Sequence, residues 1–263
     1  MFVDSHCHLD KIDPDKIGLT LQQVVDNARA QQVEKILCVN VTLEDFPQMR
    51  DTVAEFEDVS ISCGLHPLYV GDNKTPLDQM HAHLTELASE PRVVAIGETG
   101  LDYFYDPDSK AIQQQSFATH IDVAVELNKP LIIHTRDARE DTLALLNNGH
   151  AERCGGVLHC FTETLEMAER AIDELGFYIS ISGIASFRNA EALRDVVKAL
   201  PLERLLIETD SPWLAPVPHR GKQNQPAYVT DVAKCVADTK GISLEEVAKV
   251  TTQNFYNLFK GCV

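Results

Sequence analysis

The run VVAIGE at residues 93–98 is continuously apolar until it ends in a glycine and a carboxylate. A strand with one face in water alternates apolar and polar residues, whereas a strand covered on both faces is apolar throughout. The run therefore predicts a strand of a parallel sheet that is buried on both sides, with Glu98 at the point where the strand ends.

Seven other β-prone runs surround this one, and most of them are also continuous. Segments with helical spacing separate the runs, so strand and helix alternate along the chain. The runs cover residues 2–6, 35–41, 60–65, 131–135, 156–161, 178–182 and 205–209, and the clearest helical segments cover 19–32, 116–128, 163–175, 189–200 and 243–259. Eight such units in 263 residues predict an α/β fold, a TIM-like (β/α)8 barrel forming a single domain over residues 1–263. A seven-stranded or distorted barrel would give a similar pattern.

The composition is typical of a cytoplasmic globular protein. Apolar residues make up 44% of the chain, which suffices for a full core, and the seven cysteines form no CxxC pair, which indicates reduced thiols. The sequence predicts neither export nor a membrane span, and it gives no sign of an obligate protein partner. The net charge of −17 opposes broad contact with a polyanion, so any contact with nucleic acid is expected to be local.

The predicted strand ends are rich in imidazole and carboxylate groups. In a (β/α)8 barrel the active site lies at the C-terminal ends of the strands, so these groups are expected to converge. In the HxH at the end of the first strand, a period of two points both imidazoles into the barrel and Cys7 outward. The residues concerned are His6, His8, His66, Glu98, His134, His159 and Asp210.

Each of these residues alone has an ordinary explanation. A lone histidine such as His66 is more often a satisfied polar residue than a ligand, Glu98 could be a buried acid bonded to backbone, and Asp210 could cap a helix. What favours a metal site is that so many strand ends supply His, Glu or Asp, where valine or threonine would serve packing equally well.

The predicted metal ligands are His6, His8, Glu98, His134, His159 and Asp210. Because six ligands exceed what one tetrahedral ion with an open position needs, the sequence predicts two divalent ions bridged by Glu98. Such ions lower the pKa of a bound water from about 15.7 to near 7, and Asp210 is expected to accept its proton, so Glu98 and Asp210 are the predicted catalytic residues. Mg²⁺, Mn²⁺ and Zn²⁺ all accept mixed His and carboxylate ligands, so the metal stays open.

The motifs together resemble those of the TatD family of metal-dependent deoxyribonucleases, among the amidohydrolase-like barrels, and most closely its YcfH-like branch. The similarity spans the whole chain in family order, through DSHCHLD, GLHP, GETGLDY, IIHTRDA, LHCF, ETDSPWLAP and PHRGKQNQPAYV. The resemblance implies a TIM-like barrel that cleaves phosphodiester bonds in DNA, often from a 3′ end, with magnesium, manganese or zinc. It also implies one ion held by His6, His8, Glu98 and Asp210, and a second held by Glu98, His134 and His159.

One position departs from the family. Family members commonly read NEP in the loop after the eighth strand, whereas this chain has Asn224, Gln225 and Pro226. Gln225 keeps the size of the family's glutamate but loses its charge. The substitution is expected to alter substrate handling while leaving the metal centre untouched.

Residues near the predicted site are candidates for binding the substrate. Cationic side chains would hold phosphate and aromatic side chains would stack on a base, although ordinary loop solvation explains the cations about equally well. The predicted substrate-binding residues are His66, Tyr103, Arg136, Arg220, Lys222 and Asn224, with Tyr228 as a second stacking candidate.

Two other functions remain open at this point. The chain could hydrolyse a small phosphoester, lactone or amide, which the acidic net charge favours, or it could be a metal-binding barrel without catalysis. The retention of every ligand argues against the latter. The sequence leaves open DNA or RNA, exonuclease or endonuclease, and the oligomeric state.

Overall fold

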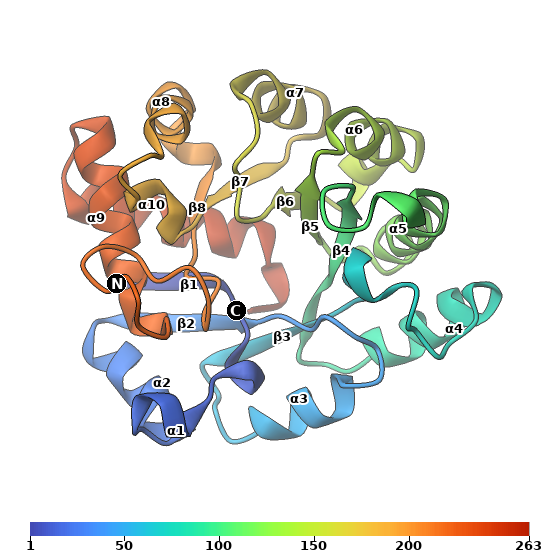
Figure 1. Ribbon diagram of the computed structural model, residues 1–263, viewed down its shortest axis with the longest axis horizontal. Coiled ribbons are helices and arrows are strands. Elements are labelled where there is room, and N and C mark those ends of the chain that lie inside the picture. The colour runs from blue at the N-terminus through green and yellow to red at the C-terminus, as the bar shows by residue number, and fades with distance from the viewer. Residues whose placement is uncertain (263) are drawn as a thin grey trace.

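The computed structural model describes residues 1–262. Its eight strands form one parallel sheet in the chain order β1 to β8, and helices surround the strands (Figure 1). The strands are β1 Phe2–Cys7, β2 Val33–Cys38, β3 Val59–Cys63, β4 Val93–Asp102, β5 Leu131–Arg136, β6 Gly156–Leu158, β7 Tyr178–Ile181 and β8 Leu205–Ile207. This architecture confirms the predicted TIM-like barrel.

The helices follow the predicted segments and add shorter ones. They are α1 Pro14–Ile17, α2 Leu21–Ala30, α3 Phe46–Thr52, α4 Leu77–Ala88, α5 Lys110–Leu127, α6 Arg139–Asn148, α7 Leu165–Leu175, α8 Glu191–Ala199, α9 Val229–Lys240 and α10 Leu244–Leu258. Side-chain caps begin several of them: at the start of α10 the hydroxyl of Ser243 accepts the N–H of Glu246 at 3.1 Å. None of the helices within residues 1–262 combines the length and hydropathy that crossing a membrane would require.

The continuous apolar runs arise because each strand packs on both of its faces. On β5, Ile132 faces the barrel interior, whereas Leu131 and Ile133 pack in the outer core beneath the helices. The interior is closed at the N-terminal end of the barrel by α10 and the turn that follows it, through Phe255 and Phe259. Apolar side chains thus fill the barrel interior except at the C-terminal ends of the strands, where polar side chains lie.

A bulge in β1 turns the two histidines of the HxH motif inward. Asp4 pairs with Ile36 of β2, and Cys7 pairs with Cys38, so β1 advances three residues while β2 advances two. The extra residue resets the alternation of faces. Val3 consequently faces the interior while Cys7, four residues later, packs in the outer core.

The barrel closes through residues that follow β8 rather than through β8 itself. The backbone N–H of Asp210 donates to the carbonyl of His6 at 2.9 Å, and the N–H of His8 donates to the carbonyl of Ser211 at 2.7 Å. A single parallel bridge joins Cys7 to Ser211. The seam between the first and last strands is thus made by the same short segments that carry the HxH motif and Asp210.

A buried histidine away from these segments ties α5 to the end of β3. His120 is fully buried, its Nε2 accepts the N–H of Leu65 at 3.0 Å, and its Nδ1 lies 2.7 Å from the carbonyl of Ser116. Burial lowers the pKa of His120 to about 4. The ring is therefore neutral in the folded protein above that pH.

We expect His120 to make folding stability fall as the pH is lowered from about 6.5 to about 4. In that window the unfolded chain protonates this histidine and the folded chain does not, which is worth about 3 kcal/mol over the whole window. Chemical denaturation of the wild type and of His120→Gln at several pH values measures the effect. The difference between the two free energies of unfolding should change across the window, and two parallel curves would contradict the assignment.

Candidate metal centre

The structure brings all six predicted metal ligands to the C-terminal end of the barrel. They surround a cavity of about 360 Å³, which five of them line directly, while His6 lies behind with its ring stacked on that of His159 at 3.9 Å. Strand geometry alone places them: β4 carries Glu98, β5 carries His134, and the other ligands lie on β1 or just past β1, β6 and β8. These parts of the chain are distant in sequence and adjacent in space.

One group of donors gathers around one oxygen of Glu98. The Nε2 atoms of His6 and His8 are 3.2 Å apart, and they lie 3.4 Å and 3.8 Å from Oε2 of Glu98. Oδ1 of Asp210 lies 3.8 Å from the Nε2 of His6 and 3.5 Å from the Nε2 of His8. Four donors in a tetrahedron around Zn²⁺, with bonds of 2.0–2.1 Å, would be about 3.3–3.4 Å apart. The spacing of this group therefore fits one divalent ion.

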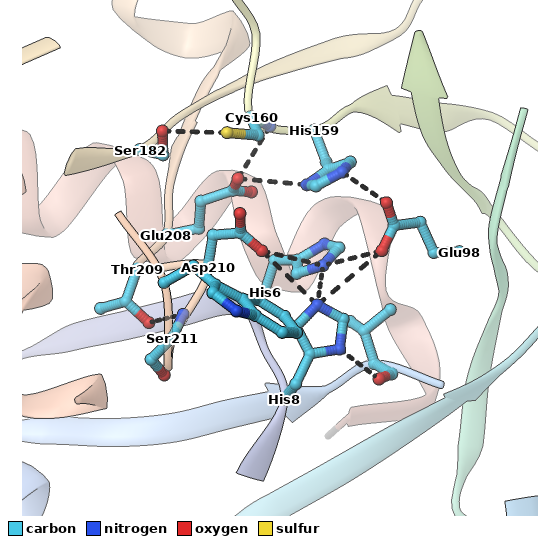
Figure 2. A network of polar contacts seen from close by, with 12 residues as sticks. His6, His8, Glu98, His159, Cys160, Ser182, Glu208, Thr209, Asp210 and Ser211 are labelled. Carbon is cyan, nitrogen blue, oxygen red and sulfur yellow. Dashed lines mark hydrogen bonds and ion pairs between the residues drawn. The ribbon is translucent and has the colours of Figure 1, made fainter. Parts of the chain in front are cut away.

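A second group gathers around the other oxygen of the same carboxylate. Oε1 of Glu98 lies 2.8 Å from Nε2 of His159, 3.4 Å from Nδ1 of His134 and 3.3 Å from Nε2 of His66. Figure 2 shows the Glu98 carboxylate beside these rings, with one oxygen joined by a dashed line to His159 and the other to His6 and His8. Each oxygen of Glu98 thus faces a different set of imidazoles.

The hydrogen bonds behind three of the rings determine which nitrogen is free to bind a metal. Nδ1 of His8 lies 2.8 Å from the carbonyl of Val39, and a carbonyl can only accept, so the proton is on Nδ1 and the lone pair of Nε2 faces the cavity. Nε2 of His134 faces Asp102 at 2.9 Å, and Nδ1 of His159 faces Glu208 at 3.3 Å. Outer carboxylates of this kind orient ligating histidines in metal sites.

His66 is held in the opposite tautomer. Its Nδ1 accepts the backbone N–H of Leu68 at 3.2 Å, so in the neutral ring the proton is on Nε2, the atom that faces Glu98. A protonated nitrogen has no lone pair for a metal. His66 is therefore placed as a hydrogen-bond donor beside Glu98, and its role as a substrate-binding residue stays a prediction.

Sequence reasoning missed the two outer carboxylates, Asp102 and Glu208. Both are fully buried, and Oε1 of Glu208 also accepts the N–H of Cys160 at 2.7 Å. Glu208 also belongs to a set of metal-binding atom types with His6 and His159; its Oε1 makes hydrogen bonds to His159 and Cys160, and its Oε2 is buried without a hydrogen-bond partner among the described residues. A signal was present, because Asp102 ends the GETGLD motif and Glu208 begins the ETDSP motif.

The charges of the site favour ionised carboxylates. Burial by itself would raise the pKa of Glu98, but in the metal-free protein the charges of protonated His159 and His66, and the hydrogen bonds that protonated His134 and His159 donate, outweigh it and hold that pKa well below its usual range. Burial would also raise the pKa of Asp210, yet the hydrogen bond that His8 donates when its ring is protonated, and the charges of the surrounding protonated imidazoles, lower it. Both acids are therefore deprotonated at neutral pH, as metal ligation requires.

The predicted substrate-binding residues divide into two sets. His66 and Arg136 line the cavity, whereas Tyr103, Arg220, Lys222 and Asn224 are not among its lining residues. Asn224 is buried, and its amide donates to the carbonyls of Thr209 at 2.7 Å and Trp213 at 2.6 Å, so it braces the loop after β8.

The aromatic and cationic candidates outside the cavity have partners of their own. The hydroxyl of Tyr103 donates to Asp141 at 2.8 Å, the guanidinium of Arg220 lies 3.7 Å from the ring centre of Phe187, and the ring of Tyr228 stacks on that of His219 at 3.6 Å. Lys222 is exposed on the same loop as Arg220.

The position that departs from the family contacts Tyr228. Nε2 of Gln225 donates to the hydroxyl of Tyr228 at 3.3 Å, and Gln225 does not line the cavity. The substitution therefore leaves the donors of the candidate centre in place.

Comparisons with known proteins agree with this geometry. The family model described as TatD-related DNase matches residues 3–260. The chain is 55% identical over 257 residues to the uncharacterised metal-dependent hydrolase YcfH of Escherichia coli K12, covering 98% of this chain and 95% of that protein. It is 33% identical over 242 residues to the 3′-5′ ssDNA/RNA exonuclease TatD of Klebsiella pneumoniae, covering 90% of each. The crystal structure of YjjV, a TatD homologue from E. coli K12, superposes with a TM-score of 0.87 at 29% identity and 98% coverage of both chains.

We expect Glu208→Gln to weaken binding of a divalent ion by about 10- to 100-fold, because the variant loses the negative charge behind His159 that fixes its tautomer. Isothermal titration of the metal-free protein with Zn²⁺ or Mn²⁺ measures this directly. Glu166→Gln, which changes an exposed glutamate on α7, is the matched control and should bind like the wild type. Equal affinities for all three proteins would show that Glu208 does not position a ligand.

Proposed function

The chain belongs to the TatD-related DNase family of metal-dependent hydrolases, and we propose that it hydrolyses phosphodiester bonds in DNA, removing nucleotides from a 3′ end. The family membership and the 33% identity to a relative described as a 3′-5′ ssDNA/RNA exonuclease support the substrate. The seven free cysteines agree with a cytoplasmic location, where such a protein would meet DNA ends.

The single observation that carries the proposal is the position of the Glu98 carboxylate. Each of its oxygens faces a different group of imidazoles, and the residue is only 3% exposed. A carboxylate that bridges two ions would need this arrangement. We assign His6, His8, Glu98 and Asp210 to one divalent ion, and Glu98, His134 and His159 to the other.

When bound, two divalent ions supply Lewis acidity at the phosphate and a lower pKa for the attacking water. The protein's own contribution begins with Asp210, whose carboxylate is ionised and lines the cavity. We assign it the proton that the attacking water loses as its oxygen bonds to phosphorus. The bond from phosphorus to the leaving 3′ oxygen then breaks, and that oxygen takes a proton from solvent.

Two side chains on the cavity wall suit a phosphate. His66 presents an N–H at Nε2, and Arg136 is an exposed guanidinium that makes no ion pair within residues 1–262. Charge-assisted hydrogen bonds to phosphate are about twice as strong as neutral ones. These two residues would hold the scissile phosphate beside the metal site. The imidazoles of the predicted metal ligands would remain free to bind metal.

A small phosphoester is the second candidate substrate. A cavity of about 360 Å³ lies at the low end of the range for ligand pockets, which runs from about 300 to 1,000 Å³. A cavity of this volume accommodates one phosphate and its sugar, either at the end of a strand or in a free small molecule. The experiment on DNA below therefore includes a small ester.

We expect the purified protein to shorten a 5′-labelled single-stranded DNA from its 3′ end in the presence of Mg²⁺, Mn²⁺ or Zn²⁺, and to stop when a chelator is added. Asp210→Asn should lower kcat by about 10²- to 10⁴-fold because the proton acceptor is lost. Glu98→Gln should abolish activity because it removes the negative charge that the two groups share. Gel electrophoresis of timed samples measures all three.

Glu166→Gln serves again as the control and should retain full activity. DNA that stays intact while the wild type alone hydrolyses a chromogenic small phosphoester would refute the DNA substrate and leave the metal centre standing. Hydrolysis of neither would refute the proposed function.

His66 and His134 contact the same oxygen of Glu98, and we expect their alanine variants to behave differently. His134→Ala should weaken metal binding, because it removes a free lone pair that Asp102 holds toward the cavity. His66→Ala should keep metal affinity within about two-fold and lose turnover, because its Nε2 carries a proton. Metal titration and steady-state kinetics on both variants make the comparison. Equal loss of metal from the two would contradict the tautomer assigned to His66.

A further inference from the structure

Four aromatic side chains are exposed in the part of the chain that the structure describes, and all four come from loops at the end of the barrel that holds the candidate site. Tyr69 is 45% exposed, Phe104 53%, Tyr105 62% and Trp213 52%. Each follows the C-terminal end of a strand: Tyr69 comes after β3, Phe104 and Tyr105 after β4, and Trp213 after β8. Tyr69 and Trp213 line the cavity, and the edge of Trp213 packs on His8 with ring centres 5.2 Å apart.

Phe104 and Tyr105 form a cluster with Arg136, which also lines the cavity. The guanidinium carbon of Arg136 lies 4.3 Å from the ring centre of Phe104 and 4.8 Å from that of Tyr105. The two rings meet edge to face at 4.9 Å. Arg136 therefore joins the cavity on one side to a pair of largely exposed aromatic rings on the other.

The same carboxylate that orients His134 fixes the loop carrying these rings. Oδ1 of Asp102 accepts the N–H of Phe104 at 3.0 Å and the N–H of Tyr105 at 2.8 Å, while Oδ2 faces His134 at 2.9 Å. The rings are thus held at a set position relative to the candidate metal centre before any substrate arrives. A binding surface that is already ordered costs less conformational entropy on binding.

Resting on the proposed function, we propose that Phe104, Tyr105 and Arg136 form a subsite that stacks an unpaired base of the strand whose phosphate lies at Glu98. More than half of each aromatic residue is exposed, which leaves ring surface for a base, and stacking of this kind holds bases irrespective of sequence. A base within a duplex is already stacked and paired, so this subsite favours single-stranded ends.

Because the protein is strongly acidic, we expect stacking, rather than contact with many phosphates, to hold the strand. At a net charge of −17 the chain has little capacity for a long cationic track, and Arg220 and Lys222 lie outside the cavity lining. Each phosphate neutralised on a single strand steepens the dependence of log affinity on log salt by about 0.7. Contact with one or two phosphates therefore gives a slope of only about −0.7 to −1.4.

The experiment compares oligonucleotides that carry a natural base or an abasic residue at each of the three 3′-terminal positions. For the wild type, kcat/KM should fall by about 5- to 150-fold when the stacked base is removed, the range attributed to one stacked base. The Phe104→Ala, Tyr105→Ala double variant should lose a similar factor on the natural strand and show no preference for the base. Leu244→Ala, an exposed apolar residue outside the cavity lining, is the control and should keep the wild-type preference.

Binding without cleavage gives a second readout. In the presence of chelator, the wild type should quench the fluorescence of a strand that carries 2-aminopurine at the preferred position, and the double variant should not. The affinity obtained from this quenching should show the shallow dependence on salt given above. An equal preference for the base in the wild type and the double variant would overturn the subsite, and so would an equal loss of activity on natural and abasic strands. A change from dimer to monomer on substitution would mark the rings as an interface between copies instead. DNA left intact by the wild type would refute the proposed function itself.

Discussion

The carboxylate of Glu98 is the constraint on which the rest of the site depends. A charge buried to this extent is unfavourable unless it is paired, and it is surrounded here by imidazoles that arrive from β1, β3, β5 and β6. Because each of its oxygens faces a different group of rings, the position of one side chain determines how far apart the two groups lie. The outer carboxylates Asp102 and Glu208 then fix the orientation of the rings.

The residues that close the barrel also supply ligands of the candidate site. β8 is short, and the first strand pairs with residues beyond it, so the backbone of His6, His8 and Asp210 makes the hydrogen bonds of the seam. Because these backbone hydrogen bonds join the two segments directly, the side chains that the segments carry are held close together. Asp102 extends this coupling outward, since it holds both the ring of His134 and the exposed loop of Phe104 and Tyr105.

Sequence reasoning reaches the barrel and the inner donors because both follow from rules that act along the chain. Continuous apolar runs indicate strands covered on two faces, and the strand-end rule brings Glu98 and His134 together without any knowledge of loops. It does not reach Glu208, because only the folded distances show which ring a second carboxylate faces. It also names Tyr103 and not its neighbours, since in the sequence YFY nothing distinguishes the tyrosine whose hydroxyl bonds to Asp141 from the more exposed Phe104 and Tyr105.

The net charge of −17 is consistent with the proposed nuclease activity if the free energy of DNA binding comes from a few local contacts. Non-specific binding of duplex DNA relies on the release of counterions by many lysines and arginines, and an acidic surface forgoes that energy. What remains is local: divalent ions at Glu98, the N–H of His66, the guanidinium of Arg136 and aromatic surface at the mouth. Each of these acts on one phosphate or one base. If the proposed function holds, an acidic barrel with such a mouth would therefore repel the length of a duplex and would attract only an end that reaches into the cavity.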